Sequence, residues 1–511
     1  MPEYGLEKEK EQKEADKLAE YKSTLTNDEL EELVKKTKEL KEYQDTPSSQ
    51  EDLEKIPILE LSDIKREPAK DYNDVKSVDG IKIVHHNIFT NKIAYINMSF
   101  DTKCVPDELI PYMGLLGSTL SLMDTKNYTY PELTNEININ CGGLATGTAL
   151  YSDKVDFSKN TIVYEVKSKA LYEKVPFVLG MMEEIMYNTR FDDYKRLKEI
   201  IARIKSRLEA SLMGQGHSIA MLECCAQFSE SAYYSDILRG YKYYEFIKKL
   251  DEEFEQNKTQ IVDKLNKLVG YIFNKDNVIV SLTADDEGYD CFVKALSAKS
   301  CNIKDEHYNT AVRSFIPVNV KTGYTSASQV QYVARCGNFV KDGYKYTGAL
   351  KVLKVIFSYD YLWINVRVKG GAYGCMSGSS RNGDFYMVSY RDPNLEKTND
   401  IYEGAADYIR NFNVSRRDMV KFIIGTIGEI DAPLTPSAIG SRSFTHYMCN
   451  CTEDMLRKDR EEVLDATVES IRELAPLIES AVGQNYLCVV GNQKQINEAA
   501  DLFDEIKPLI G

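Results

Sequence analysis

The stretch Leu-Trp-Ile-Asn-Val-Arg-Val-Lys-Gly-Gly-Ala-Tyr-Gly-Cys-Met-Ser, from Leu362 to Ser377, is the most informative part of the chain. It holds the only tryptophan in 511 residues and a β-branched run around Arg367, followed by two glycines and Tyr373. Adjacent glycines permit a sharp bend. An arginine can bind peptide carbonyls or carboxylates, and a tyrosine hydroxyl can stabilise an oxyanion. From the pattern alone, a surface arginine and a packed tyrosine at a glycine-rich hairpin is the simpler interpretation.

The glycine pair of this stretch has a counterpart earlier in the chain. Gly142-Gly143 precedes a strand-like segment, as Gly370-Gly371 does. The apolar segment that starts at Asn277 also returns at Asn485, and each copy leads into a helical pattern. Repeats of about 20–50 residues indicate solenoids, so a spacing on the order of 200 residues indicates duplicated domains instead.

Each copy contains strands with a helix, then a run of helices, then one more strand and helix. That order predicts an α+β fold with mostly antiparallel sheets and helices on one face. We expect two tandem homologous domains at residues 71–300 and 320–511, related by a pseudo-twofold axis.

Residues 1–70 have a different character, because charged residues dominate and the apolar stripes are thin. A helical pattern runs from Leu6 to Lys22. Thr26-Asn-Asp-Glu29 is a capping box that starts a second helix, and Thr46-Pro47 ends it. This region is predicted to be a helical hairpin that links larger domains.

Composition excludes several classes of protein. The net charge of −15 argues against nucleic-acid binding, and no apolar run is long enough for a membrane span. The N-terminus has no apolar signal core. Eleven cysteines without a CxxC pair indicate reduced thiols, so we expect an intracellular, cytoplasmic protein.

The histidines predict no metal site in this chain. None of the five lies in a His-Glu-x-x-His or His-x-x-Glu-His pattern, which would put two ligands on one helical face. They are His85, His86, His217, His307 and His446.

The motif Arg-Val-Lys-Gly-Gly-Ala-Tyr-Gly at 367–374 resembles the arginine/tyrosine motif in the C-terminal half of the M16 zinc metallopeptidases, the insulysin and pitrilysin clan. The best match within the clan is subfamily C, the presequence proteases. Residues 25–32 resemble the linker of that subfamily, and residues 111–117 and 130–137 resemble its third domain. The chain therefore looks like the helical linker plus the C-terminal half, with two M16-type (LuxS/metallopeptidase-like) domains.

The resemblance implies roles for five residues of the motif. Arg367 would bind substrate carbonyls and Tyr373 would help to hold the oxyanion, so both are candidate catalytic and substrate-binding residues. Lys369, Gly370 and Gly371 would shape their loop and contact substrate.

The resemblance also implies partners. Zinc is expected in an N-terminal half that this sequence does not contain, and no cofactor is expected in this chain. The partners would be that zinc-bearing half and unstructured peptides, with no nucleic acid and no membrane. The chain alone is predicted to be inactive. Two readings stay open: half of a longer peptidase, slightly favoured by the start just before the linker, or a non-catalytic scaffold subunit that pairs with a separate zinc-bearing chain.

Other candidate sites have simpler explanations. Gly370 to Gly374 lacks the residues of a phosphate loop. Cys375 with His446 could form a nucleophilic pair, but an idle thiol is the better interpretation. His446, Cys449 and Cys451 are too close in sequence for good metal geometry, and His217 is expected to cap or pack a helix. The tyrosines at 233–244 could line a peptide-binding chamber, although helix packing is favoured.

Overall fold

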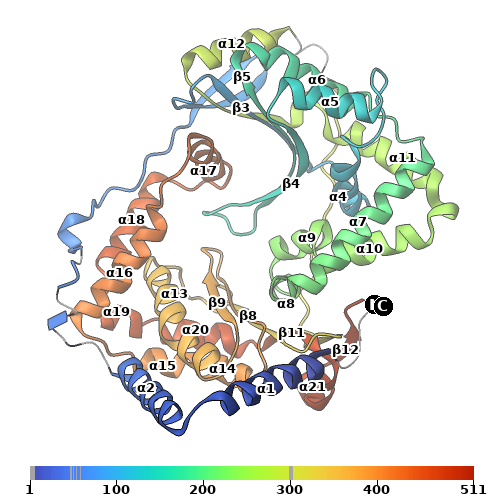
Figure 1. Ribbon diagram of the computed structural model, residues 1–511. Helices are drawn as coiled ribbons and strands as arrows, with labels where there is room; N and C mark the ends of the chain where they lie inside the picture. Colours follow the sequence, from blue (N-terminus) through green and yellow to red (C-terminus); the bar gives the residue numbers. More distant parts are fainter. Residues whose placement is uncertain are drawn as a thin grey trace. The chain divides into compact units, whose positions relative to one another are not determined.

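The computed structural model describes residues 6–46, 49, 51, 52, 55–57, 59–298 and 303–510. The chain divides into two compact units, Met1–Asp63 and Ile64–Gly511. Figure 1 draws the helices and strands of both, coloured along the sequence. The break falls a few residues before the predicted end of the linker region at residue 70. No helix in the described ranges has both the length and the apolar character that a membrane crossing requires.

The first unit contains the two predicted helices, α1 (Leu6–Thr24) and α2 (Asn27–Asp45), and the short helix η1 (Leu61–Asp63). The capping box is confirmed: the Thr26 side chain accepts from the Glu29 backbone N–H, and the Glu29 carboxylate accepts from the Thr26 N–H at 2.8 Å. Leu18 and Leu33 remain about half exposed, at 62% and 48%. Pro47, the predicted helix stop, lies outside the described residues.

The second unit contains two six-stranded sheets. The first has the strand order β1-β2-β6-β3-β5-β4, in which only the β2–β6 pair is parallel. Its strands are β1 (Asp74–Val78), β2 (Ile81–Asn87), β3 (Ile93–Asp101), β4 (Leu144–Ser152), β5 (Asn160–Leu171) and β6 (Val278–Ala284).

The second sheet repeats this order as β12-β7-β11-β8-β10-β9, with β7 parallel to both β11 and β12. The outer strand beside β2 is β1, which comes from the start of the first copy. The outer strand beside β7 is β12, which comes from the end of the second copy. The strands are β7 (Thr322–Ser326), β8 (Tyr332–Asn338), β9 (Gly374–Ser379), β10 (Asp384–Tyr390), β11 (Tyr486–Asn492) and β12 (Glu505–Pro508).

Helices fill the intervals between the strands. Between β3 and β7 they are η2 (Asp107–Leu109), α4 (Ile110–Thr119), α5 (Tyr130–Asn140), η3 (Tyr172–Lys174), α6 (Val175–Tyr187), α7 (Tyr194–Gly214), α8 (Gly216–Ala226), α9 (Glu230–Arg239), α10 (Tyr241–Glu252), α11 (Phe254–Ile272), η4 (Lys275–Asn277) and α12 (Asp286–Ser297). After β8 they are α13 (Ala349–Tyr359), η6 (Trp363–Val368), α14 (Glu396–Glu403), α15 (Ala405–Arg410), α16 (Arg416–Ile430), α17 (Pro436–Met448), α18 (Glu453–Leu464), α19 (Val468–Arg472), α20 (Ala475–Gly483), α21 (Gln493–Glu498) and η7 (Ala500–Leu502).

Each sheet has a helix of the other copy against one face. The helix α8 packs on β8, β10 and β11 of the second sheet, and α17 packs on β2 and β6 of the first. Both contacts depend on glycine. A Cβ atom at Gly216 would overlap the Tyr332 ring, and one at Gly440 would overlap the Thr283 side chain. This reciprocal exchange is what a twofold relation between the copies would produce.

The opposite face of the first sheet carries the main core. Alternation along β2 turns Ile81 and Ile83 into this core and Val84 toward Phe444 of α17. The α+β class with two tandem sheets of matching strand order is confirmed. The sheets are mostly antiparallel, as predicted, with one parallel pair in the first sheet and two in the second. Helices cover both faces of each sheet rather than one face. The strand β5 runs to Leu171, and the helix α6 starts at Val175.

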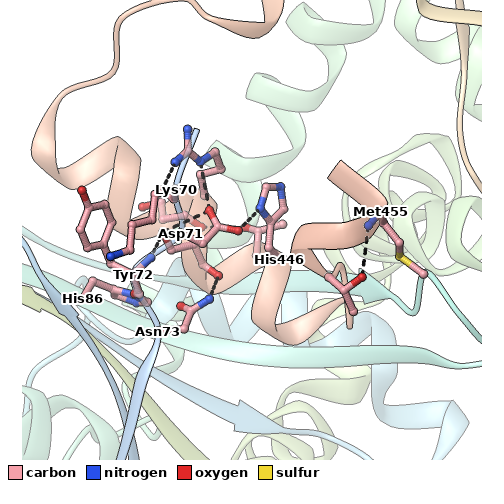
Figure 2. Close-up of polar contacts among 12 residues, drawn as sticks. Lys70, Asp71, Tyr72, Asn73, His86, His446 and Met455 are labelled. Atoms are coloured by element: carbon pink, nitrogen blue, oxygen red, sulfur yellow. Dashed lines mark hydrogen bonds and ion pairs between the residues drawn. The ribbon is translucent and has the colours of Figure 1, made fainter. Parts of the chain in front are cut away.

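The chain segment before β1 ties α17 to the first sheet (Figure 2). Asp71 accepts from His446 Nδ1 at 2.6 Å and from Arg442 Nε at 3.3 Å, and Asn73 donates to the Ser443 carbonyl. Burial would raise the pKa of Asp71, but the bonds and positive charges of His446 and Arg442 outweigh it and hold that pKa below its ordinary value. The residue His446 is therefore structural here.

Candidate functional site

The residues around Arg367 form a π-helix rather than the predicted β-branched arm of a hairpin. This helix, η6, covers Trp363–Val368 and directly follows the α13 region. The Lys369 N–H donates to the Ile364 carbonyl at 2.9 Å, a bond that spans five residues. Leu362 and Val366 are fully buried and anchor the turn, so tertiary packing overrides the strand preference of its β-branched residues.

Both glycines of the motif are required by the turn that follows. Gly371 has a φ of +83°, and its N–H donates to the Arg367 carbonyl at 2.8 Å. A Cβ at Gly370 would collide with the carbonyl oxygen of Val366. The side chain of Asn394 donates to the Gly370 carbonyl at 2.6 Å and closes the turn. Hydrogen bonds from the Gly371 N–H and from the Asn394 side chain therefore stabilise this turn.

Arg367 lies between two aromatic rings. Its guanidinium carbon is 4.1 Å from the centroid of Trp363 and 5.6 Å from that of Tyr373. Such contacts stabilise a cation through the ring faces and leave the N–H edges of the guanidinium available. No carboxylate or carbonyl within the described ranges pairs with the Arg367 side chain. Its donors can therefore bind an added ligand.

Tyr373 is oriented by an aromatic chain that starts in the first copy. Its ring meets Tyr390 edge-on at 5.8 Å, and Tyr390 meets His217 of α8 edge-on at 4.9 Å. The Tyr373 N–H also donates to the Arg391 carbonyl at 3.2 Å. The side chain is still 66% exposed, and its hydroxyl has no partner in the described part of the chain.

The five predicted site residues thus share one loop. Arg367 is half-buried, Lys369 is exposed, and Gly370 and Gly371 shape the bend before Tyr373. The sequence did not reveal the roles of Trp363, Tyr390 and His217. The contacts of Tyr390 with Tyr373 and with His217 join separate segments of the chain. The predicted helix packing of His217 is observed, and burial lowers the pKa of its imidazole.

Cys375, directly after the loop, is not activated. Burial raises the pKa of its thiol to about 11, and the nearby charge of Asp392 adds to the rise. His446 bonds to Asp71 instead. The thiol is therefore neutral near pH 7 and lacks a base.

The five histidines of this chain do not form a centre of the kind that the resemblance implies for the N-terminal half. His85 and His86 point to opposite sides of β2 and bond to Ala284 and Tyr72 carbonyls, and His217 packs on tyrosines. One group of possible ligands gathers Asp276, Asp305 and His307 within 4.8 Å, but all three are exposed. The described residues thus provide no buried donor set on one helix.

The tyrosines at 233–244 serve packing. Tyr234, Tyr241, Tyr243 and Tyr244 are at most 6% exposed and lie in the hydrophobic clusters under α9 and α10. This agrees with the helix-packing interpretation.

Comparison with known families matches two models. Residues 1–250 match the family described as associated with subfamily C of peptidase family M16, and residues 323–492 match "PreP C-terminal domain". The Arg367 loop lies within the second match.

Curated relatives match over the whole chain. Protein HypA of Clostridium perfringens is 39% identical over 514 residues, covering 100% of this chain and 52% of the relative. Presequence protease 1, chloroplastic/mitochondrial, of Arabidopsis thaliana is 30% identical over 517 residues, covering 99% of this chain and 47% of the relative. The chain thus spans about half the length of the curated relatives it matches.

Solved structures show the same fold at low identity. A peptidase M16 inactive domain from Pseudomonas fluorescens gives a TM-score of 0.57 at 14% identity, covering 85% of this chain and 98% of that one. A conserved protein from Enterococcus faecalis gives 0.59 at 13% identity, covering 81% and 97%.

Proposed function

The chain belongs to subfamily C of the M16 peptidases, the subfamily of the presequence proteases, and we propose that it acts as the C-terminal half of a zinc endopeptidase that degrades unfolded peptides. In this proposal the chain binds the peptide and stabilises the transition state. An N-terminal half supplies the zinc ion, its ligands and the general base. The observation that carries the proposal is the pair of available hydrogen-bonding groups, on Arg367 and Tyr373, that belong to one hydrogen-bonded loop.

Arg367 binds the peptide main chain in this proposal. Its guanidinium offers several N–H donors in a fixed plane, and stacking on Trp363 fixes the orientation of that plane. Two adjacent carbonyls of an extended peptide, or a carboxylate, fit such a donor set. This role predicts an effect of Arg367 on both peptide binding and turnover.

Tyr373 stabilises the oxyanion. Its hydroxyl has no competing partner within the described residues, and its ring is held by Tyr390. A hydroxyl that is oriented before the reaction needs no reorganisation when negative charge develops on the carbonyl oxygen. This role predicts an effect mainly on kcat.

The proposal is tested by joining the chain to an N-terminal half that carries a His-x-x-Glu-His helix. Tyr373→Phe should lower kcat roughly 10- to 1000-fold, as expected for one lost oxyanion donor, and Arg367→Ala should lower kcat and raise KM. Tyr359→Phe is a matched control, because Tyr359 is also exposed, at 71%, and lies before the loop.

Wild-type rates in both site variants would overturn the assignment. Peptide binding without cleavage by any such combination would favour the non-catalytic scaffold subunit instead.

A further inference from the structure

The edge strand β9 has one free side. It pairs with β10 from Gly374 to Ser379, and no strand in the described ranges pairs with its other side. Every second N–H and C=O group of an edge strand points away from the sheet, and these groups are a template for an added strand. The question is whether space exists beside β9 for such a strand.

A groove of about 680 Å³ adjoins the C-terminal end of β9. Ser377 to Ser380 line it together with Asp384 and Tyr386 of β10, and the rest of its lining comes from α8, α9, α13 and Leu150 of β4. The Ser377 hydroxyl is buried and has no hydrogen-bond partner in the described structure. The last residues of the unpaired strand and one unsatisfied polar group therefore lie in the lining of this groove.

The groove and the candidate site are parts of one continuous segment. Tyr373 directly precedes the first residue of β9. Six residues of strand extend roughly 20 Å. A ligand strand paired with β9 would therefore run from the Arg367 and Tyr373 loop to the groove at Ser377–Ser380.

We propose that an unstructured peptide binds this chain as an additional strand on the free edge of β9, with one end beside Arg367 and Tyr373 and the other in the groove between α9 and α13. This inference rests on the proposed function and adds the binding mode. Strand addition recognises main-chain groups, so it suits peptides of varied sequence.

Arg239 adds a side-chain preference to the groove. It lines the α9 wall, is exposed, and has no acceptor in the described part of the chain. Lys351 and Lys354 on the α13 wall are instead paired, with Asp459 and Glu429. The available cation favours an acidic side chain of the peptide, next to the apolar Leu222 and Leu350.

The mode of binding is tested with a labelled, unstructured peptide that contains one aspartate and is long enough to span β9. In a strand, successive N–H groups point to opposite edges. N-methylation of the peptide should therefore weaken binding with a period of two, by roughly three- to tenfold at alternate positions and not at the positions between them. Amide exchange should slow at alternate residues of Gly374–Ser379, those whose N–H groups point away from β10.

The side-chain contact is tested by Arg239→Ala, which should weaken binding of the same peptide roughly three- to tenfold. Arg203→Ala, at an exposed position of α7, should leave binding unchanged. Absence of peptide binding, methylation effects without a period of two, or unchanged exchange in β9 with bound peptide would overturn the inference. If β9 shows no protection but cleavage by the joined halves still depends on Tyr373, the proposed function survives and only strand addition is wrong.

Discussion

Trp363 and Arg367 stack on each other within the π-helix, with the guanidinium carbon 4.1 Å from the centroid of the indole. The two residues are four positions apart, which places them nearly one above the other where a turn holds more than four residues. The indole is 39% exposed, and the guanidinium of Arg367 lies over its face.

Loss of the indole should therefore disorder the guanidinium. In the joined enzyme we expect Trp363→Ala to lower kcat/KM roughly three- to thirtyfold, in line with about 0.5–2 kcal/mol for a cation–π contact. Trp363→Phe retains a ring face and should recover most of the loss. Steady-state kinetics of both variants provides the measurement, and equal rates for alanine and wild type would show that the stacking is incidental.

Gly371 should matter more for activity than for folding. In Gly371→Ala the added methyl group would contact only Pro393, at 3.5 Å. The expected loss of about 1–2 kcal/mol in the free energy of unfolding therefore comes from the positive φ. The loop can relieve that strain by moving Tyr373, so kcat should fall more than this loss of stability explains. Gly374→Ala, with Tyr390 at 3.8 Å and no positive φ, should be nearly neutral. Comparable activity in the two variants would contradict this account of the loop.

Gly440 should be essential for the packing of α17 on the first sheet. Gly440→Ala would push a methyl group into Thr283 and should lower the free energy of unfolding by about 1–3 kcal/mol. Gly428→Ala, also in a helix but with nothing within 4 Å, should raise it by about 1 kcal/mol. Denaturant titration of both variants measures the difference, and a stabilised Gly440→Ala variant would disprove the close contact.

His86 should make stability depend on pH. Its Nδ1 donates to the Tyr72 carbonyl, so Nε2 accepts from the Ser281 hydroxyl at 2.9 Å and the ring is neutral. Burial lowers its pKa from 6.5 to about 4. The unfolded state therefore binds the proton more readily than the folded state does. The stabilisation that comes from keeping this ring neutral and buried is complete above pH 6.5 and is lost as the pH falls toward 4.

Between pH 7 and pH 5 the loss should amount to about 2 kcal/mol. Unfolding titrations at the two pH values should show a smaller difference for His86→Gln than for the wild type. His307→Gln is the control, because that side chain is 75% exposed. An identical pH dependence in His86→Gln would show that another group is responsible.

Local patterns predicted part of the framework. The apolar segment from Asn277 and the helical pattern after it correspond to β6 and α12, and the capping box marked the start of α2. The edge strands β1 and β12 were missed, since they are short and mostly exposed. The strand β12 also pairs with β7, which lies far away in sequence, and local pattern carries no information about such a partner.

The site was only partly predictable. Arg367 and Tyr373 came from the motif, but Ile364, Val366 and Val368 suggested a strand where a π-helix forms. The contacts of Tyr373 with Tyr390, and of Tyr390 with His217, join separate segments, and so do the walls of the β9 groove. Assignments that depend on such contacts require the folded structure.

The most direct test of the central claim is the peptidase rate of the isolated chain, measured with and without the zinc-bearing N-terminal half. The account predicts no hydrolysis and no stoichiometric zinc in the isolated chain, because the described histidines are committed to other partners or lie exposed. Chelator-sensitive cleavage should appear when the halves are mixed, weakly because no linker raises their effective concentration. Chelator-sensitive hydrolysis by the isolated chain, together with one equivalent of bound zinc, would contradict the account.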